Sequence, residues 1–197
     1  YNQLTLGNEF DLVCPSEYMF MKLIAEDRLQ PLSEGFFDTG KEDNYYIRGV
    51  SDYIRNIFDT NTINGKAWSK YAAGYMWGTT GIVYNPEVIS KEEASHWAIL
   101  ADPKYKGQVT IKDNVRDSYF AALGILNEDE LTQPDFINSP DRLERIAELM
   151  NRTDEATVNT AESILKEMKE NAYSFESDSG KADMVTGKVL ANYQWSG

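Results

Sequence analysis

The most constraining feature of the sequence is a strand pattern that runs into a helix pattern within residues 104–126. The β-branched run at 109–111 follows a glycine and is typical of a buried strand. A charged loop comes next at 112–118, and a helix pattern begins behind it with Asp117 or Ser118 as the expected N-cap. Such a loop lies at the carboxyl end of a strand, where ligands bind in open α/β sheets.

The charged loop has two interpretations. The carboxylates of Asp113 and Asp117 and the amide of Asn114 suit a ligand that is positively charged or rich in N–H donors. Alternatively, Asp117 caps its own helix, and Asp113 pairs with Lys112 or Arg116. The loop taken alone favours this second, structural interpretation.

Strand and helix patterns alternate along the rest of the chain, which predicts an α/β fold with mostly parallel sheets. Strand patterns occur at residues 10–14 and 189–195, and helix patterns at 17–28, 91–100 and 160–171. Residues 75–84 hold two apolar runs joined by small residues. This arrangement fits one long strand, a crossing between lobes, or a hairpin.

A second strand-to-helix joint is predicted around Ser16. Pro15 ends the strand pattern, and Ser16 is the expected N-cap of the helix that follows. Glu17 in the first turn suits the positive end of the helix dipole. Ser16 and Tyr18 are therefore expected to be exposed at this joint.

The chain has one cysteine and one histidine, which limits its covalent and metal chemistry. No disulfide can form within the chain, and a Cys/His zinc cluster is impossible. Cys14 lies in an apolar run, so we expect a buried structural thiol. His96, beside Trp97, is expected to be a surface or packing residue.

The charge balance narrows the class of partner. The net charge of −13 disfavours binding to a nucleic-acid backbone, which needs a basic face. An acidic surface is compatible with steering a small cation toward a cleft. The chain also lacks a run of about 20 apolar residues that could span a bilayer.

Motifs for catalysis or phosphate binding are missing from the sequence. It has no glycine-rich phosphate loop, and nothing around His96 marks it as the base for a serine nucleophile. Asp113 and Asp117 are the one local carboxylate pair that could serve a hydrolase. We therefore predict a binding protein and not an enzyme, with no cofactor and no metal site.

The polar and aromatic residues suit an organic cation. Carboxylates supply charge-assisted hydrogen bonds to ammonium groups. The rings of Trp77 and Trp195 could contact methylene groups, and they attract ammonium charge by about 0.5–2 kcal/mol each.

Several segments match a known family in order and spacing. They are residues 10–13 with 15–18, 75–81 with 84–85, 102–107, 113–117, and 195–197. On these segments the chain resembles the spermidine/putrescine-binding proteins, the extracytoplasmic receptors of polyamine ABC transporters.

The resemblance implies a two-lobe architecture like that of type II periplasmic binding proteins, incomplete in this chain. Residues 1–76 would form a partial first lobe and residues 77–197 most of the second, with the crossing between lobes near 75–81. The lobes of the family close about a hinge on binding.

The resemblance also implies a set of ligand-binding residues. Ser16 and Tyr18 would line the cleft from the first lobe, and the acidic loop would bind amino groups from the second lobe. Trp195 would pack on the methylene chain of the ligand. The predicted set is Ser16, Tyr18, Asp113, Asn114, Asp117 and Trp195.

Two positions depart from the family pattern, which often has Asp where this chain has Asn114 and Glu where it has Asp117. A different ligand length, a weaker site or the use of Asp113 would follow. We expect the chain to be an internal segment of a longer protein that binds polyamine weakly by itself. We also expect exposed strand edges that favour dimerisation.

The implied function is that of a receptor for spermidine or putrescine, with the membrane permease of an ABC importer as its partner. The implied location is the periplasm or the outer face of the cell membrane, with a lipid anchor as one option. The alternatives are a receptor for another solute, such as iron or thiamine, and a carboxylate-dependent hydrolase.

Overall fold

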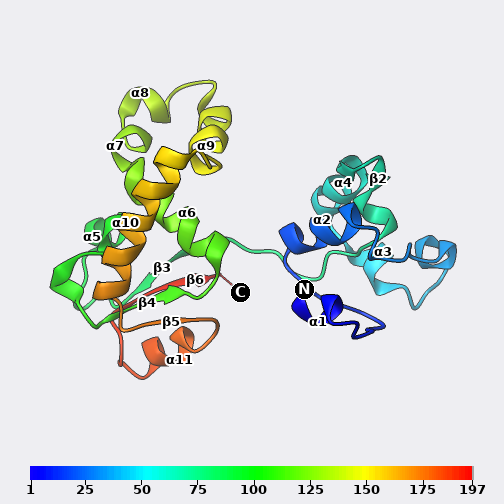
Figure 1. Cartoon of the computed structure of the whole chain (residues 1–197), viewed down its shortest axis with the longest axis horizontal. Coiled ribbons are helices and arrows are strands. Elements are labelled where there is room, and N and C mark those ends of the chain that lie inside the picture. The colour runs from blue at the N-terminus through cyan, green and yellow to red at the C-terminus, as the bar shows by residue number, and fades with distance from the viewer. Residues whose placement is uncertain (197) are drawn as a thin grey trace. The chain divides into compact units, whose positions relative to one another are not determined.

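The structure is a computed structural model that describes residues 1–196. The chain forms two compact units, Tyr1–Trp77 and a second unit that begins at Gly78 (Figure 1).

The first unit is mainly helical. Its elements are α1 (Asn2–Thr5), α2 (Glu17–Ala25), η1 (Glu34–Phe37), α3 (Tyr45–Gly49), α4 (Asp52–Thr60), β1 (Thr62–Ile63), β2 (Lys66–Ala67) and η2 (Trp68–Lys70). The indole of Trp68 lies at the centre of the core, with its ring edge-on to Phe20 at 5.6 Å and to Phe58 at 5.9 Å. Ile24 of α2 completes this small buried cluster.

The strand predicted at residues 10–14 is wrong, and so is the buried thiol. These residues adopt no strand, Leu12 is 88% exposed, and the Cys14 thiol is exposed. A strand needs a neighbour for its backbone N–H and C=O groups. Within the described part of this unit, β1 and β2 pair only with each other, so residues 10–14 have no sheet to join.

The second unit is built on a four-stranded sheet with the order β3-β6-β4-β5. Its strands are β3 (Thr80–Tyr84), β4 (Val109–Lys112), β5 (Ser174–Glu176) and β6 (Ala191–Trp195). β4 runs parallel to β5 and β6, and β3 runs antiparallel to β6. The predicted mostly parallel α/β arrangement is confirmed for this unit.

Helices lie on both sides of this sheet. The helices of the unit are α5 (Lys91–Ala94), η3 (Trp97–Leu100), η4 (Pro103–Tyr105), α6 (Val115–Leu126), α7 (Glu128–Leu131), α8 (Pro134–Ile137), α9 (Arg142–Met150), α10 (Glu155–Asn171) and α11 (Gly180–Val185). The sheet lies between α11 and the packed pair α6 and α10 (Figure 1). The helix predicted at 91–100 is split into α5 and η3, because the backbone of His96 is extended.

Only the second of the two apolar runs at residues 75–84 forms a strand. Tyr75, Met76 and Trp77 adopt no strand and are 70–79% exposed. This observation excludes both one long strand and a hairpin. The interpretation as a crossing between lobes is left as a prediction.

The two faces of the sheet differ in chemistry. Val109, Ile111 and Tyr193 point to the side of α6 and α10 and belong to the apolar core. The alternate residues form a polar face that is also buried, each less than 9% exposed: Thr110, Lys112, Glu176, Asn192 and Gln194. α11 reaches this face at Gly180, because a Cβ there would lie 1.7 Å from Nδ2 of Asn192.

Gly180→Ala is expected to destabilise the second unit by about 1–3 kcal/mol, because the added methyl group overlaps Asn192. Urea unfolding measures this change. Gly81→Ala is the matched control, since a Cβ there meets no atom within 4 Å, and it should change stability by less than about 0.5 kcal/mol. Equal stability of the two variants would contradict the close packing of α11.

Candidate functional site

Asn114 shapes the loop between β4 and α6. It is the N-cap of α6 with an extended backbone, and its Oδ1 accepts hydrogen bonds from the N–H groups of Arg116 at 3.0 Å and Asp117 at 3.2 Å. The prediction of Asp117 or Ser118 as N-cap is therefore wrong. The helix begins earlier because the Asn114 amide satisfies two N–H groups of its first turn.

This cap leaves the Asp117 carboxylate available for other contacts. Asp117 lies in the first turn of α6, where the helix dipole favours an ionised acid. The indole Nε1–H of Trp195 donates a hydrogen bond to Oδ2 of Asp117 at 3.1 Å. The structure thus brings together two of the predicted ligand residues that are 78 positions apart.

Trp195 is held at the end of β6, opposite Thr80 of β3. The next residue extends this pairing, since Ser196 N–H donates to the Thr79 carbonyl oxygen at 2.8 Å and Thr79 N–H donates to Ser196 Oγ at 3.1 Å. Trp195 remains 41% exposed, so part of its ring can contact a ligand.

Asp113 lies apart from the Asp117–Trp195 pair and lines a cavity. Its backbone N–H donates to the Glu176 carbonyl oxygen at 2.8 Å, and its side chain is exposed. Asp113 lines an open cavity of about 510 Å³ whose walls include Lys169, Tyr173 and Phe175 but neither Asp117 nor Trp195.

Ser16 and Tyr18 lie together at the start of α2 in the first unit. Ser16 is the N-cap by backbone conformation, but its hydroxyl makes no capping hydrogen bond. Instead, the Ser16 carbonyl oxygen accepts from Met19 N–H at 3.0 Å and Phe20 N–H at 3.1 Å. Tyr18 is 39% exposed, so the predicted exposure of both residues at this joint is confirmed.

Tyr193 is a buried neighbour of the site that the sequence reasoning missed. Its ring is fully buried, and its hydroxyl donates to Thr80 Oγ1 at 3.3 Å. Burial raises the pKa of Tyr193 to about 12, opposed by the Thr80 hydrogen bond and reinforced by the negative charge of Asp117. The available signal was the alternation in β6, which places Tyr193 on the same face as Trp195.

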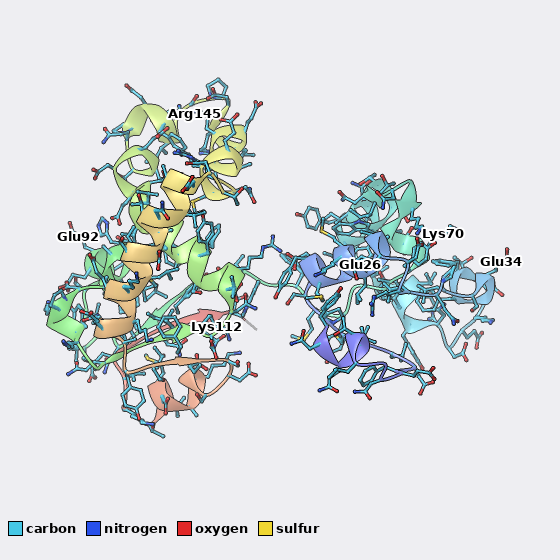
Figure 2. The ribbon with its side chains drawn as sticks, in the orientation of Figure 1. Glu26, Glu34, Lys70, Glu92, Lys112 and Arg145 are labelled. Carbon is cyan, nitrogen blue, oxygen red and sulfur yellow. The ribbon has the colours of Figure 1, made fainter. Side chains whose placement is uncertain are left out.

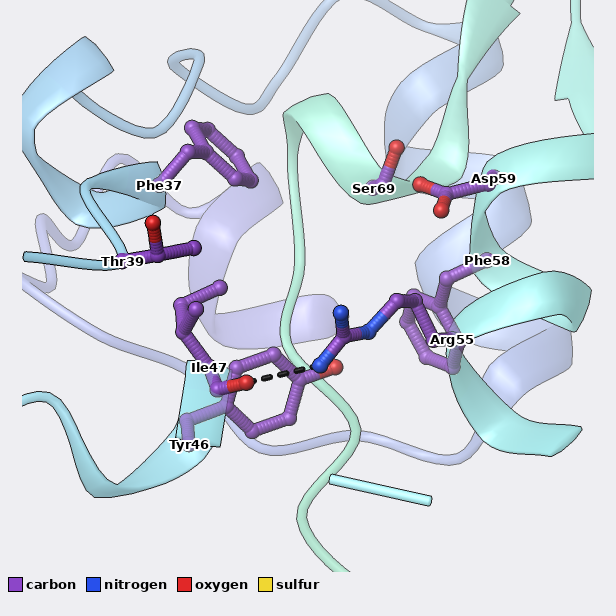
Figure 3. Close-up of a pocket in the computed structure, with 8 residues that line it drawn as sticks. All are labelled: Phe37, Thr39, Tyr46, Ile47, Arg55, Phe58, Asp59 and Ser69. Carbon is purple, nitrogen blue, oxygen red and sulfur yellow. Dashed lines mark hydrogen bonds between the residues drawn. The ribbon is translucent and has the colours of Figure 1, made fainter. Parts of the chain in front are cut away.

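The first unit has a cavity of its own, of about 180 Å³, lined by aromatic and polar side chains (Figure 3). In its wall the guanidinium of Arg55 donates from Nη2 to the Ile47 carbonyl oxygen at 2.7 Å. This cation disfavours a cationic ligand there, and the lining includes none of the predicted ligand residues.

Residues 1–196 show neither a metal site nor a membrane-spanning helix. No group of three or more His, Cys, Asp or Glu side chains is arranged to hold a metal ion. No helix in that range is both long and apolar enough to cross a membrane.

Residues 11–193 match the family model described as bacterial extracellular solute-binding protein. The chain belongs to this family. Its members are binding proteins and not enzymes, so the hydrolase alternative is dropped and the prediction of a non-enzymatic protein is confirmed.

Relatives of this chain include proteins named as spermidine/putrescine-binding periplasmic proteins. The chain is 26% identical over 188 residues to the spermidine/putrescine-binding periplasmic protein of Escherichia coli, covering 95% of this chain and 44% of that protein. It is 23% identical to spermidine/putrescine-binding periplasmic protein 1 of Haemophilus influenzae, with 95% and 43% covered. The predicted resemblance is confirmed, and the chain spans less than half the length of these relatives.

Solved structures support the fold of the family. The substrate-binding protein PotD of a spermidine/putrescine ABC transporter from Streptococcus pneumoniae superposes with a TM-score of 0.60 at 22% identity, covering 99% of this chain and 50% of that one. The TpPotD lipoprotein of Treponema pallidum gives 0.65 at 14% identity, with 100% and 53% covered. A protein of Listeria monocytogenes gives 0.71 at 22% identity, with 100% and 52% covered. The predicted periplasmic-binding-protein fold is confirmed.

Asn114→Ala is expected to destabilise the second unit by about 1 kcal/mol, because two N–H groups of α6 lose their acceptor. Asn114→Asp keeps an acceptor in place and serves as the matched control. Urea unfolding compares the three proteins. Equal loss in both variants would show that the amide group does more than cap the helix.

Tyr193 should make stability depend on pH in the alkaline range. Its folded pKa of about 12 exceeds the unfolded value of about 10, so the folded state retains the proton more strongly. The stabilisation is complete below about pH 10 and is lost as the pH rises toward 12. Urea unfolding between pH 8 and 12 should show a smaller decline in Tyr193→Phe than in the natural chain, and identical declines would disprove this coupling.

Proposed function

We propose that the full-length protein is a polyamine receptor that delivers spermidine or putrescine to the permease of an ABC importer. The observation that supports this proposal most is the hydrogen bond from the Trp195 indole to the Asp117 carboxylate. It lies at the carboxyl end of the parallel strands β4 and β6, the place where ligands bind in open α/β sheets. The names of the relatives support the polyamine as ligand.

The pair would recognise one end of the ligand. Asp117 accepts one hydrogen bond from Trp195 through Oδ2, and a carboxylate can accept further donors on its two oxygens. A primary ammonium supplies such donors together with a charge. The exposed part of the Trp195 ring would cover the adjoining methylene groups and attract the cation.

Asn114 would act by shaping the loop. Its amide oxygen already accepts two backbone N–H groups, so we assign the charge recognition at this end to Asp117. We further propose that the two units correspond to the two lobes of the family. Ser16 and Tyr18 of the first unit would then contribute ligand contacts in the full-length protein.

Other parts of the proposal follow from the family. A location in the periplasm or on the outer face of the membrane is consistent with the names of the relatives, one of which is a lipoprotein. Dimerisation through exposed edges stays a prediction, as does weak binding by this chain alone. A receptor for another solute, such as iron or thiamine, is the second candidate.

Asp117→Asn in the full-length protein is expected to weaken the binding of spermidine and putrescine by about tenfold or more, because the charge-assisted hydrogen bond is lost. Isothermal titration calorimetry measures this effect. Asp113→Asn removes the neighbouring charge and should have a smaller effect, while Asp135→Asn, an exposed acid of α8, is the control for net charge.

The same calorimetry discriminates between ligands. If the natural protein gives no heat with either polyamine but binds thiamine or ferric iron, the polyamine assignment is wrong. Tyr18→Phe should only reduce polyamine affinity, whereas it would abolish binding of a metal that uses the phenolate oxygen as a ligand.

A further inference from the structure

The polar face of the second unit's sheet contains a buried lysine. Lys112 is 6% exposed and points to the side of the sheet on which α11 lies (Figure 2). Removing an ammonium from water costs several kcal/mol unless acceptors replace the water. Nζ of Lys112 donates to the Ser177 carbonyl oxygen and to Oε1 of Gln194 at 3.0 Å. The charge is thus held in place by these two acceptors.

The contact with Lys112 fixes the orientation of the Gln194 amide. An ammonium can only donate, so Gln194 must turn its oxygen toward Lys112. The same oxygen accepts the backbone N–H of Trp195 at 2.9 Å, and Nε2 of Gln194 donates to Oε1 of Glu176 at 3.4 Å. Glu176 holds the Nε2 side of the amide, and Lys112 holds the oxygen side. Without Lys112 the oxygen is no longer fixed from its own side, and the acceptor of the Trp195 N–H can shift.

Trp195 links the orientation of the Gln194 amide to the predicted ligand residue Asp117. Trp195 ends β6, and its indole N–H holds Oδ2 of Asp117 at 3.1 Å. A shift of the Trp195 backbone moves the indole, and Asp117 then loses the donor that orients its carboxylate. The contacts form one continuous path from Lys112, on the buried polar face, to Asp117 in the first turn of α6.

We propose that Lys112 is a positioning residue for the cation site, acting through Gln194 and Trp195 on the Asp117 carboxylate. Its effect on affinity rests on the proposed function, whereas the path of contacts is independent of the ligand. In this role Lys112 would act from the buried face of the sheet and not as a ligand contact.

Direct electrostatics predicts the opposite effect on affinity. A positive charge near a cation site repels the ligand, so removing it would tighten the binding of polyamines. Positioning instead predicts weaker binding. The sign of the change therefore separates the two roles.

The test uses Lys112→Met in the full-length protein, a side chain of similar length without charge. Calorimetry with spermidine and putrescine is expected to show about tenfold weaker binding. Lys166→Met is the matched control, because Lys166 is exposed and pairs with Glu162 one turn away in α10. The Lys166→Met variant should bind both polyamines with unchanged affinity. Unchanged or tighter binding by Lys112→Met overturns the proposal.

A double-mutant cycle tests the path. Gln194→Leu breaks it at the next step and should weaken binding to a similar extent. Adding Lys112→Met to Gln194→Leu should then cost nothing further, because both changes interrupt one path. Fully additive losses would overturn the role of Gln194.

A spectroscopic readout separates failure of this proposal from failure of the proposed function. The indole N–H signal of Trp195 in the ¹H–¹⁵N spectrum, identified by its loss in Trp195→Phe, should shift and exchange faster in both Lys112→Met and Gln194→Leu. The Trp68 indole in the other unit should not respond. An unchanged Trp195 signal in folded variants overturns the positioning role of Lys112. A shifted Trp195 signal in the variants, with no polyamine binding by the natural protein, overturns only the assignment of a polyamine as the ligand.

Discussion

The second unit depends on the placement of β6 between β3 and β4. β6 pairs antiparallel with β3 and parallel with β4, so the last strand of the described chain holds the two halves of the sheet together. Its alternating residues also serve both faces, with Tyr193 in the apolar core and Gln194 in the polar layer. The end of the same strand presents Trp195 to Asp117. The fold of the unit and the candidate site thus both depend on β6.

Much of the second unit could be predicted from sequence because its signals are local. The β-branched run Val109-Thr110-Ile111 followed by a charged loop and an apolar helix marks β4 and α6. The exact cap could not be predicted, because Asn114, Asp117 and Ser118 are all good capping residues. Which of them accepts the N–H bonds depends on the direction in which the chain leaves β4.

Features that depend on distant partners escaped prediction. Residues 10–14 have the composition of a strand, but no neighbouring strand pairs with them in the described structure. Asn192 and Gln194 alternate with Ala191 and Tyr193 and would suit a solvated face. The short helix α11 buries them, and its close approach at Gly180 carries no sequence signal stronger than a glycine. The path of contacts from Lys112 to Asp117 could not be predicted either, because it joins residues that are far apart in sequence.

The position of β6 also affects how the unit is made. A ribosome synthesises β3 and β4 before β6, so neither strand has its shared neighbour until the end of this segment emerges. The central pairing joins residues far apart in sequence, and such long-range contacts slow folding. In the described sheet β3 has β6 as its neighbour, so β3 stays unpaired until residues 191–195 have been synthesised. That order is compatible with export, which every extracellular member of the family must undergo.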